Sequence, residues 1–263
     1  MIANYHTHTP LCHHADGTMR DYVETAVERG LETLGFACHT PYPFPNGYDS
    51  GFRMSLDDQK TYVDTILALR KEFEGKINIL IGYEAEYYPA LFCDLLDVLN
   101  RYPCDYIIMG QHFTKNEYDG GFHTFGGSDD INDVHEYVRQ TSEAMRLGVY
   151  TYFAHPDMMS YKGDTDEYLD AMRGICLVAK ETDTPLEINM LGLGEGRSYP
   201  KKSFFKMAAA CGCKAVIGCD AHSPKYVADP ERLKMALDFA DECGIEVLET
   251  VKLRRPVLLK EDK

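Results

Sequence analysis

The sequence lacks a long apolar run, an excess of basic residues and a paired-cysteine motif, and each absence argues against one class of protein. No run of about 18 apolar residues is present, and the first residues lack the basic segment and apolar stretch of a signal peptide. We therefore expect no membrane association and a cytoplasmic location. Lysine and arginine number 27 against 42 aspartate and glutamate residues, which gives a formal net charge of −15. This balance disfavours binding to long nucleic acid, whereas a small phosphorylated substrate is compatible with it because bound cations can reverse the local field.

The cysteines also argue against several kinds of chemistry. They are scattered, odd in number and without a Cys-x-x-Cys pair, so we expect buried thiols in a reducing compartment rather than a disulfide framework. Cys12 has a nearby histidine, His14, but no third group that would orient it as a nucleophile. A serine nucleophile is disfavoured because the chain contains no Gly-x-Ser-x-Gly turn.

Short apolar runs typical of strands alternate with segments of helical periodicity along the 263 residues. This alternation predicts an α/β fold in one domain spanning residues 1–263. After a short N-terminal strand, we expect strands at residues 33–38, 77–83, 105–110, 150–154, 185–188, 215–218 and 245–248. Helices are expected at residues 18–29, 55–74, 90–100, 131–147, 166–181 and 230–243, and the residues after 248 are expected to fray. Because each return to a parallel strand needs a crossover, this order favours a parallel barrel, with a doubly wound open sheet as the alternative.

Possible metal ligands recur where the expected strands end. His6 and His8 are two residues apart and project from the same side of an extended backbone, although such a pair alone is also typical of chance surface histidines or a purification tag. The later strand ends add His39, Glu84, His112, His155, Asp220 and His222. In a barrel these ends meet at one mouth. Six imidazoles and two carboxylates exceed what one ion binds, which predicts a multinuclear site with a bridging carboxylate.

The candidate ligands belong to motifs that occur in order along nearly the whole chain. These motifs are His6-Thr7-His8, Thr9-Pro10-Leu11-Cys12, His14-Ala15, His39, Thr40-Pro41-Tyr42-Pro43, Gly82-Tyr83-Glu84, Gly110-Gln111-His112-Phe113, His155-Pro156-Asp157 and Asp220-Ala221-His222. As a set they resemble the polymerase and histidinol phosphatase (PHP) superfamily, and within it the monofunctional histidinol-phosphate phosphatases. The resemblance implies a distorted seven-stranded (β/α)7 barrel, similar to a TIM barrel, that holds up to three divalent ions of zinc, iron or manganese.

The resemblance also implies how the ligands divide among the ions. A first ion would be held by His6, His8, Glu84 and Asp220. A second ion would share Glu84 as a bridge and be completed by His112 and His155. A third ion would be held by His14, His39 and His222. The implied reaction is hydrolysis of a phosphomonoester, histidinol phosphate to histidinol and phosphate, in which Glu84 and Asp220 count as catalytic and a metal-bridging hydroxide attacks phosphorus.

Further residues are expected to bind substrate or move protons. Arg197 resembles the phosphate-binding arginine of the family, and Lys162 is expected to assist it. Asp16 is a candidate for orienting a ligand or protonating the leaving group, beside a metal-bound water or a pocket histidine. His13 and His123 receive no role.

A glycine-rich loop at residues 113–130 is too long for a plain connector, and we expect it to act as a lid. Together with Glu86 and Asp157, this loop is expected to supply acidic groups for the cationic head of the substrate. The expected partner is therefore a small phosphorylated molecule, and the sequence does not indicate an oligomeric state.

Two rival functions stay open at this point. A PHP-type phosphodiesterase or exonuclease acting on nucleotides or short oligonucleotides would use the same ions, and the acidic net charge disfavours only long nucleic acid. A non-catalytic metal-binding module of the same superfamily would be expected to lose ligands, whereas every ligand position is intact in this chain.

Overall fold

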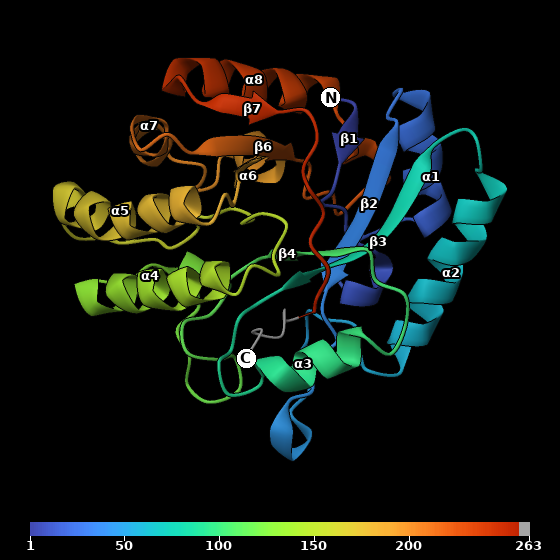
Figure 1. The fold of residues 1–263 in the computed structure, drawn as a ribbon, viewed down its shortest axis with the longest axis horizontal. Coiled ribbons are helices and arrows are strands. Elements are labelled where there is room, and N and C mark those ends of the chain that lie inside the picture. The colour runs from blue at the N-terminus through green and yellow to red at the C-terminus, as the bar shows by residue number, and fades with distance from the viewer. Residues whose placement is uncertain (258–263) are drawn as a thin grey trace, which may run out of the picture.

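The computed structural model describes residues 1–257, and in it two parallel sheets are surrounded by helices (Figure 1). The first sheet has four strands in the order β1-β2-β3-β4, and the second has three in the order β5-β6-β7. Their bounds are β1 Ala3–Asn4, β2 Thr33–His39, β3 Asn78–Ala85, β4 Tyr106–Met109, β5 Leu186–Asn189, β6 Lys214–Gly218 and β7 Glu246–Leu248. Beyond their first residues, β2 and β3 are buried throughout, as expected of parallel strands covered on both faces.

The segment before His155 links the two sheets. Phe153 forms isolated parallel bridges with Met109 of β4 and with Leu186 of β5, and Thr7 forms another with Ala221, just after β6. The regular strand predicted at residues 150–154 is therefore wrong. Its extended stretch ends because His155 has a φ of 33° and turns the chain out of the sheet direction. The result is a curled parallel arrangement rather than a flat open sheet.

All six predicted helices are present. With two further helices, their bounds are α1 Met19–Glu28, α2 Asp58–Glu72, α3 Phe92–Leu99, α4 Ile131–Arg146, α5 Thr165–Glu181, α6 Met190–Glu195, α7 Lys202–Ala210 and α8 Pro230–Cys243. Local sequence signals fix several ends. The hydroxyl of Thr18 accepts a hydrogen bond from the backbone N–H of Asp21, whose carboxylate accepts one from Thr18 N, so α1 begins with a capping box. Proline begins α8 and Gly244 in a left-handed conformation ends it.

The short helix α6 directly follows β5 and is not indicated by helix propensity, since it contains Gly192 and Gly194. Tertiary packing explains both glycines. A Cβ at Gly192 would overlap Tyr199, and one at Gly194 would overlap Arg232. The side chain of Asn189 caps the helix by accepting a hydrogen bond from Gly192 N at 2.8 Å. The close approach of these neighbours therefore requires glycine where propensity alone would reject a helix.

A buried tyrosine fills the space between the first strands. A Cβ at Gly35 or at Gly82 would overlap the side chain of Tyr106, so these two glycines make room for its ring. The Tyr106 hydroxyl donates to the carbonyl of Tyr5 at 2.7 Å and lies 3.1 Å from that of Phe36. The space between these strands is therefore filled by a hydrogen-bonded side chain.

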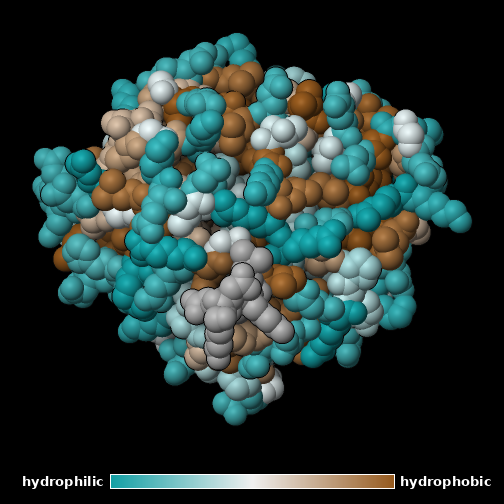
Figure 2. Space-filling view, viewed as in Figure 1, coloured by the Kyte–Doolittle hydropathy of each residue, from teal (hydrophilic) through white to brown (hydrophobic). Residues whose placement is uncertain are grey.

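The surface agrees with the composition. No helix within residues 1–257 is long and apolar enough to cross a bilayer. On the face shown in Figure 2, hydrophilic side chains predominate and apolar ones form smaller groups between them. The cysteines are free thiols, and the expectation that they are buried is wrong for Cys93, which is exposed.

The segment after β7 does not fray at once, which corrects the expectation for residues 249–257; residues 258–263 lie outside the described part of the chain. In Figure 1 the segment runs in red across the front of the molecule. Ile107 N donates to the carbonyl of Arg254 at 3.2 Å. The Arg254 guanidinium donates to the carbonyls of Tyr150, Thr182 and Asp183 and to the hydroxyl of Thr184, at 2.8–3.1 Å.

We predict that Arg254→Ala lowers the free energy of unfolding by about 2 kcal/mol, because a charged donor is removed and the carbonyls of Tyr150, Thr182 and Asp183 lose a partner. Urea denaturation followed by circular dichroism measures the change. The matched control is Arg255→Ala at the exposed neighbouring arginine, which should stay within about 0.5 kcal/mol of the unmodified protein. Equal stabilities for the two variants would contradict a structural role of this segment.

Candidate metal centre

The carboxyl ends of the strands surround a pocket of about 490 Å³. Its walls come from eight predicted site residues and from eight that were not predicted. The lining residues are His14, His39, Gly51, Phe52, Glu84, His112, His123, Phe125, His155, Met158, Leu191, Glu195, Arg197, Tyr199, Asp220 and His222. His6 and His8 are fully buried and contact the lining residues Glu84 and Asp220 from below. The structure therefore brings together every histidine and carboxylate predicted as a ligand.

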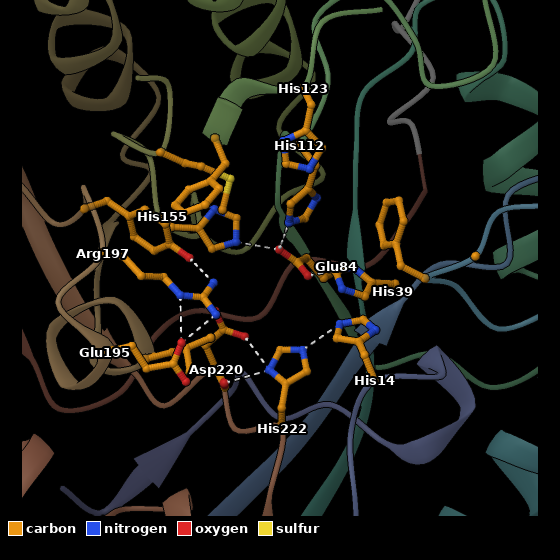
Figure 3. Close-up of a pocket in the computed structure, with 16 residues that line it drawn as sticks. His14, His39, Glu84, His112, His123, His155, Glu195, Arg197, Asp220 and His222 are labelled. Carbon is orange, nitrogen blue, oxygen red and sulfur yellow. Dashed lines mark hydrogen bonds and ion pairs between the residues drawn. The ribbon is translucent and has the colours of Figure 1, made fainter. Parts of the chain in front are cut away.

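Glu84 lies at the centre of this group (Figure 3). Its Oε1 is 2.8 Å from His155 Nε2 and 3.5 Å from His112 Nε2. Its Oε2 is 3.0 Å from His39 Nδ1, and the register of β2 and β3 places His39 directly beside Glu84. A Cβ at Gly110 would overlap Oε1, so that position must be glycine. One carboxylate thus faces imidazoles on two sides, as a bridging ligand requires.

Asp220 forms the second acidic point of the centre. Its Oδ1 is 3.1 Å from His8 Nε2 and 3.5 Å from His6 Nε2. The amide of Asn189 donates to its Oδ2 at 3.0 Å, which leaves Oδ1 directed at the imidazoles. Asp220 has a φ of 48°, and this left-handed backbone brings His222 back toward the same carboxylate, with Nδ1 at 3.4 Å from Oδ1.

The donor set fits metal ions. His6 Nδ1 donates to the Glu187 carboxylate at 2.7 Å, which directs Nε2 of the same ring at Nε2 of His8, 3.2 Å away. His14 and His222 also face each other through Nε2 atoms, at 3.0 Å. Two unprotonated ring nitrogens cannot bond to one another, whereas a cation satisfies both. Several sets of three side chains could each hold an ion, because the three ligand atoms of a set lie within 4.8 Å of one another. Such sets include His6 with His8 and Glu84, His6 with His155 and Asp220, and His8 with His39 and His222.

The electrostatics favour the same conclusion. Burial would raise the pKa of the Glu84 carboxyl, but His112 and His39 oppose it and hold that pKa well below its usual range. Asp220 is affected in the same way, with burial opposed first by His6. Burial lowers the pKa of His39 to about 4, so its imidazole is neutral at pH 7. Burial would lower the pKa of His8, but its hydrogen bond to Asp220 opposes this and raises that pKa to about 9, so a metal ion displaces a proton there. Carboxylates and imidazoles are the donors that zinc, iron and manganese share.

A buried carboxylate that the sequence analysis missed orients the first pair of histidines. Glu187 in β5 is fully buried, and besides accepting from His6 it accepts from His155 N at 3.0 Å and from Asn189 Nδ2 at 2.9 Å. A Cβ at Gly218 would overlap its Oε1. The signal available in the sequence was a glutamate between the apolar residues Leu186 and Ile188 of an expected buried strand, where an ionised side chain needs a specific partner.

The acidic groups expected to bind the substrate head are used elsewhere, which corrects that expectation. Glu86 is fully buried and accepts from His112 Nδ1 at 2.7 Å, so it orients a candidate ligand instead of facing the pocket. Asp157 is also fully buried and accepts from the backbone N–H of Lys201. The acidic side chain at the pocket wall outside the ligand set is Glu195, whose Oε2 accepts from Arg197.

The remaining predicted residues differ in their placement. Arg197 lines the pocket, and its Nη1 donates to the Tyr199 hydroxyl at 2.9 Å. Lys162 is exposed and does not line the pocket; its side chain lies along Gly127. Asp16 is exposed and also outside the lining, and its backbone N–H donates to the carbonyl of His222. The structure therefore places Arg197 at the pocket wall, whereas Lys162 and Asp16 lie outside the lining residues.

The expected lid loop forms one wall of the pocket. Phe113 and His123 pair as an antiparallel bridge within it, and both His123 and Phe125 line the pocket. His13 is exposed, with a left-handed φ of 66°, and does not line the pocket. His123 thus gains a place at the site that sequence reasoning left open.

Comparison with known proteins defines the class of this fold and site. Residues 4–190 match the PHP domain family model, and the chain belongs to that family. Among curated relatives, it is 29% identical over 238 residues to the "Probable histidinol-phosphatase" of Deinococcus radiodurans, covering 86% of this chain and 88% of the relative. It is 28% identical over 247 residues to the histidinol-phosphatase of Bacillus subtilis, covering 82% and 92%. The same fold occurs in the histidinol phosphate phosphatase of Lactococcus lactis, solved with zinc, L-histidinol and phosphate, with a TM-score of 0.72, 23% identity and coverage of 95% and 96%.

We predict that Glu187→Gln weakens metal binding roughly 10–100-fold, because loss of the carboxylate removes the partner that holds His6 in its metal-binding tautomer. Chelator competition with zinc measures the affinity without any substrate. Glu181→Gln, at an exposed glutamate paired with Arg146, is the matched control and should bind as the unmodified protein does. Unchanged affinity in Glu187→Gln would mean that this carboxylate does not support the centre.

Proposed function

We propose that this chain is a metal-dependent phosphomonoesterase that hydrolyses histidinol phosphate to histidinol and phosphate. The observation that carries the proposal is the convergence of seven imidazoles and the carboxylates of Glu84 and Asp220 at one pocket that also contains Arg197. Two relatives that share most of their length with this chain carry the name histidinol-phosphatase. The neighbour of the same fold from Lactococcus lactis was solved with both halves of that substrate, L-histidinol and phosphate.

The proposed ligands are His6, His8, His14, His39, Glu84, His112, His155, Asp220 and His222, for up to three divalent ions of zinc, iron or manganese. When bound, such ions activate water and neutralise phosphoryl oxygens. Glu84 faces histidines on both of its oxygens, and this position supports its assignment as the bridge. Glu187 and Glu86 hold the far nitrogens of His6 and His112, so the ring nitrogens that face the pocket stay free to coordinate.

Other side chains of the pocket suit the two ends of the substrate. The guanidinium of Arg197 offers a planar pair of donors to a terminal phosphate. Glu195, beside it, offers a carboxylate to a cationic amine, and its side chain is 40% exposed. Phe52, Phe125 and Tyr199 supply aromatic walls, which exclude water from the reacting group and suit a flat imidazole.

We also propose that the curled sheets close into a distorted seven-stranded barrel. The bridges of Phe153 on one side, and of Thr7 with Ala221 on the other, support this closure. Closure explains why strand ends from both sheets reach the same pocket, since an open sheet would separate them. A cytoplasmic location also stays part of the proposal, and the free cysteines support it.

A phosphatase panel on protein of known metal content tests the function. The panel contains histidinol phosphate, sugar phosphates, nucleotides and an activated phosphodiester. We expect histidinol phosphate to have the highest kcat/KM. A preference for nucleotides or for the diester would support the rival diesterase instead, and no turnover by fully loaded protein would support a non-catalytic module.

Arg197→Met is expected to lower kcat/KM for histidinol phosphate by roughly 10–100-fold, because a charge-assisted pair with a terminal phosphate contributes about 1.5–3 kcal/mol. Hydrolysis of bis-p-nitrophenyl phosphate should fall much less, since a diester carries less charge and fewer free oxygens. Metal content should not change because Arg197 lies outside the ligand set. Arg146→Met, at an exposed arginine paired with Glu181, serves as the control. Equal loss of both activities with the metal retained would contradict a monoester-selective role.

A further inference from the structure

Arg53 is an arginine buried between two carboxylates next to the pocket, with 2% of its side chain exposed. Its Nη1 and Nη2 donate to the two oxygens of Glu86, both at 2.7 Å. Its Nε donates to Oε2 of Glu117 at 2.8 Å. The side chains of Glu86 and Glu117 are 0% and 2% exposed. One guanidinium therefore neutralises two carboxylates that water does not reach.

The two carboxylates belong to different parts of the site. Glu86 follows β3 and also accepts from Nδ1 of His112, a proposed metal ligand, at 2.7 Å. Glu117 belongs to the loop at residues 113–130, whose His123 lines the pocket. Arg53 thus joins a proposed metal ligand and a wall of the pocket through a single side chain.

We propose that Arg53 is a positioning residue, which seats the loop at residues 113–130 through Glu117 and orients His112 through Glu86. The inference rests on the proposed function only in taking His112 as a metal ligand. It extends that function, because it makes the seating of the loop and the orientation of a ligand depend on the same residue.

The geometry requires arginine at this position. A guanidinium presents five donors in a fixed plane and can pair with two carboxylates at once, whereas an ammonium is a single point charge. The Arg53 guanidinium carbon also lies 4.4 Å from the ring centroid of Phe52, and Phe52 lines the pocket. Arg53 therefore also supports the pocket wall through a cation–π contact with Phe52.

The loop arm of the proposal is tested by trypsin cleavage after Lys115. This lysine is exposed, and its backbone is held by Gln140, which accepts from Lys115 N at 2.7 Å, so cleavage there requires the loop to open. Glu117→Gln removes one buried ionic contact, and we expect cleavage at Lys115 to become about tenfold faster. KM should rise with little change in kcat, because the loop lines the pocket but does not coordinate the ions.

The ligand arm is tested by chelator competition for zinc, which uses no substrate. Glu86→Gln is expected to weaken metal binding roughly 10–100-fold, because Nδ1 of His112 loses its carboxylate partner, while cleavage at Lys115 stays as in the unmodified protein. Arg53→Lys should show both defects in one variant. If Arg53→Lys fails to fold, the two glutamine variants still decide the proposal separately.

The chain offers a matched control in Arg139 of α4. This arginine also lies between two glutamates, Glu136 and Glu143, but its side chain is 51% exposed. Arg139→Lys should change neither cleavage nor metal affinity. The proposal is overturned if Arg53→Lys behaves as Arg139→Lys does, or if the two glutamine variants leave both readouts unchanged. Cleavage at Lys115 and zinc affinity do not involve turnover. If both change as expected but histidinol phosphate is not hydrolysed, the proposed function is rejected and the role of Arg53 remains.

Discussion

The buried carboxylate of Glu84 is the contact on which the rest of the site depends. It lies within 3.7 Å of ring nitrogens from five histidines, namely His6, His8, His39, His112 and His155. An isolated carboxylate in this position would be costly to bury, and its neighbours keep it ionised. Contacts between Glu84 and these histidines therefore hold the strand ends of the first sheet to the segment that ends at His155. Tyr106 packs between the strands below them.

Around this centre lies a second group of buried carboxylates, which fixes the histidines from behind. Glu187 accepts from His6, and Glu86 accepts from His112. Gly218 leaves room for the Glu187 side chain, and Arg53 pairs with Glu86. Such outer partners set the tautomer and direction of each imidazole, and they commonly matter to metal affinity almost as much as the ligands. The geometry of the centre thus depends on these buried partners as well as on the ligands themselves.

Much of this arrangement could be predicted from the sequence. Parallel strands bring their carboxyl ends to one edge, so histidines that recur after apolar runs were expected to meet, and they do. Helix ends with local signals, such as the capping box of α1, were also predictable. The roles of Glu187 and Arg53 were not, because each depends on partners far away in the chain: His6 lies 181 residues from Glu187, and Glu117 lies 64 residues from Arg53. Pattern reasoning places residues on elements, but it does not pair side chains across loops.

The central claim is that Glu84 stands between metal ions held by the strand ends. Anomalous X-ray diffraction from crystals grown with manganese or zinc tests it most directly, because it locates each ion independently of activity. We predict three peaks per chain, two of them on opposite oxygens of Glu84 and the third among His14, His39 and His222. A single peak, or peaks that do not contact Glu84, would contradict this account.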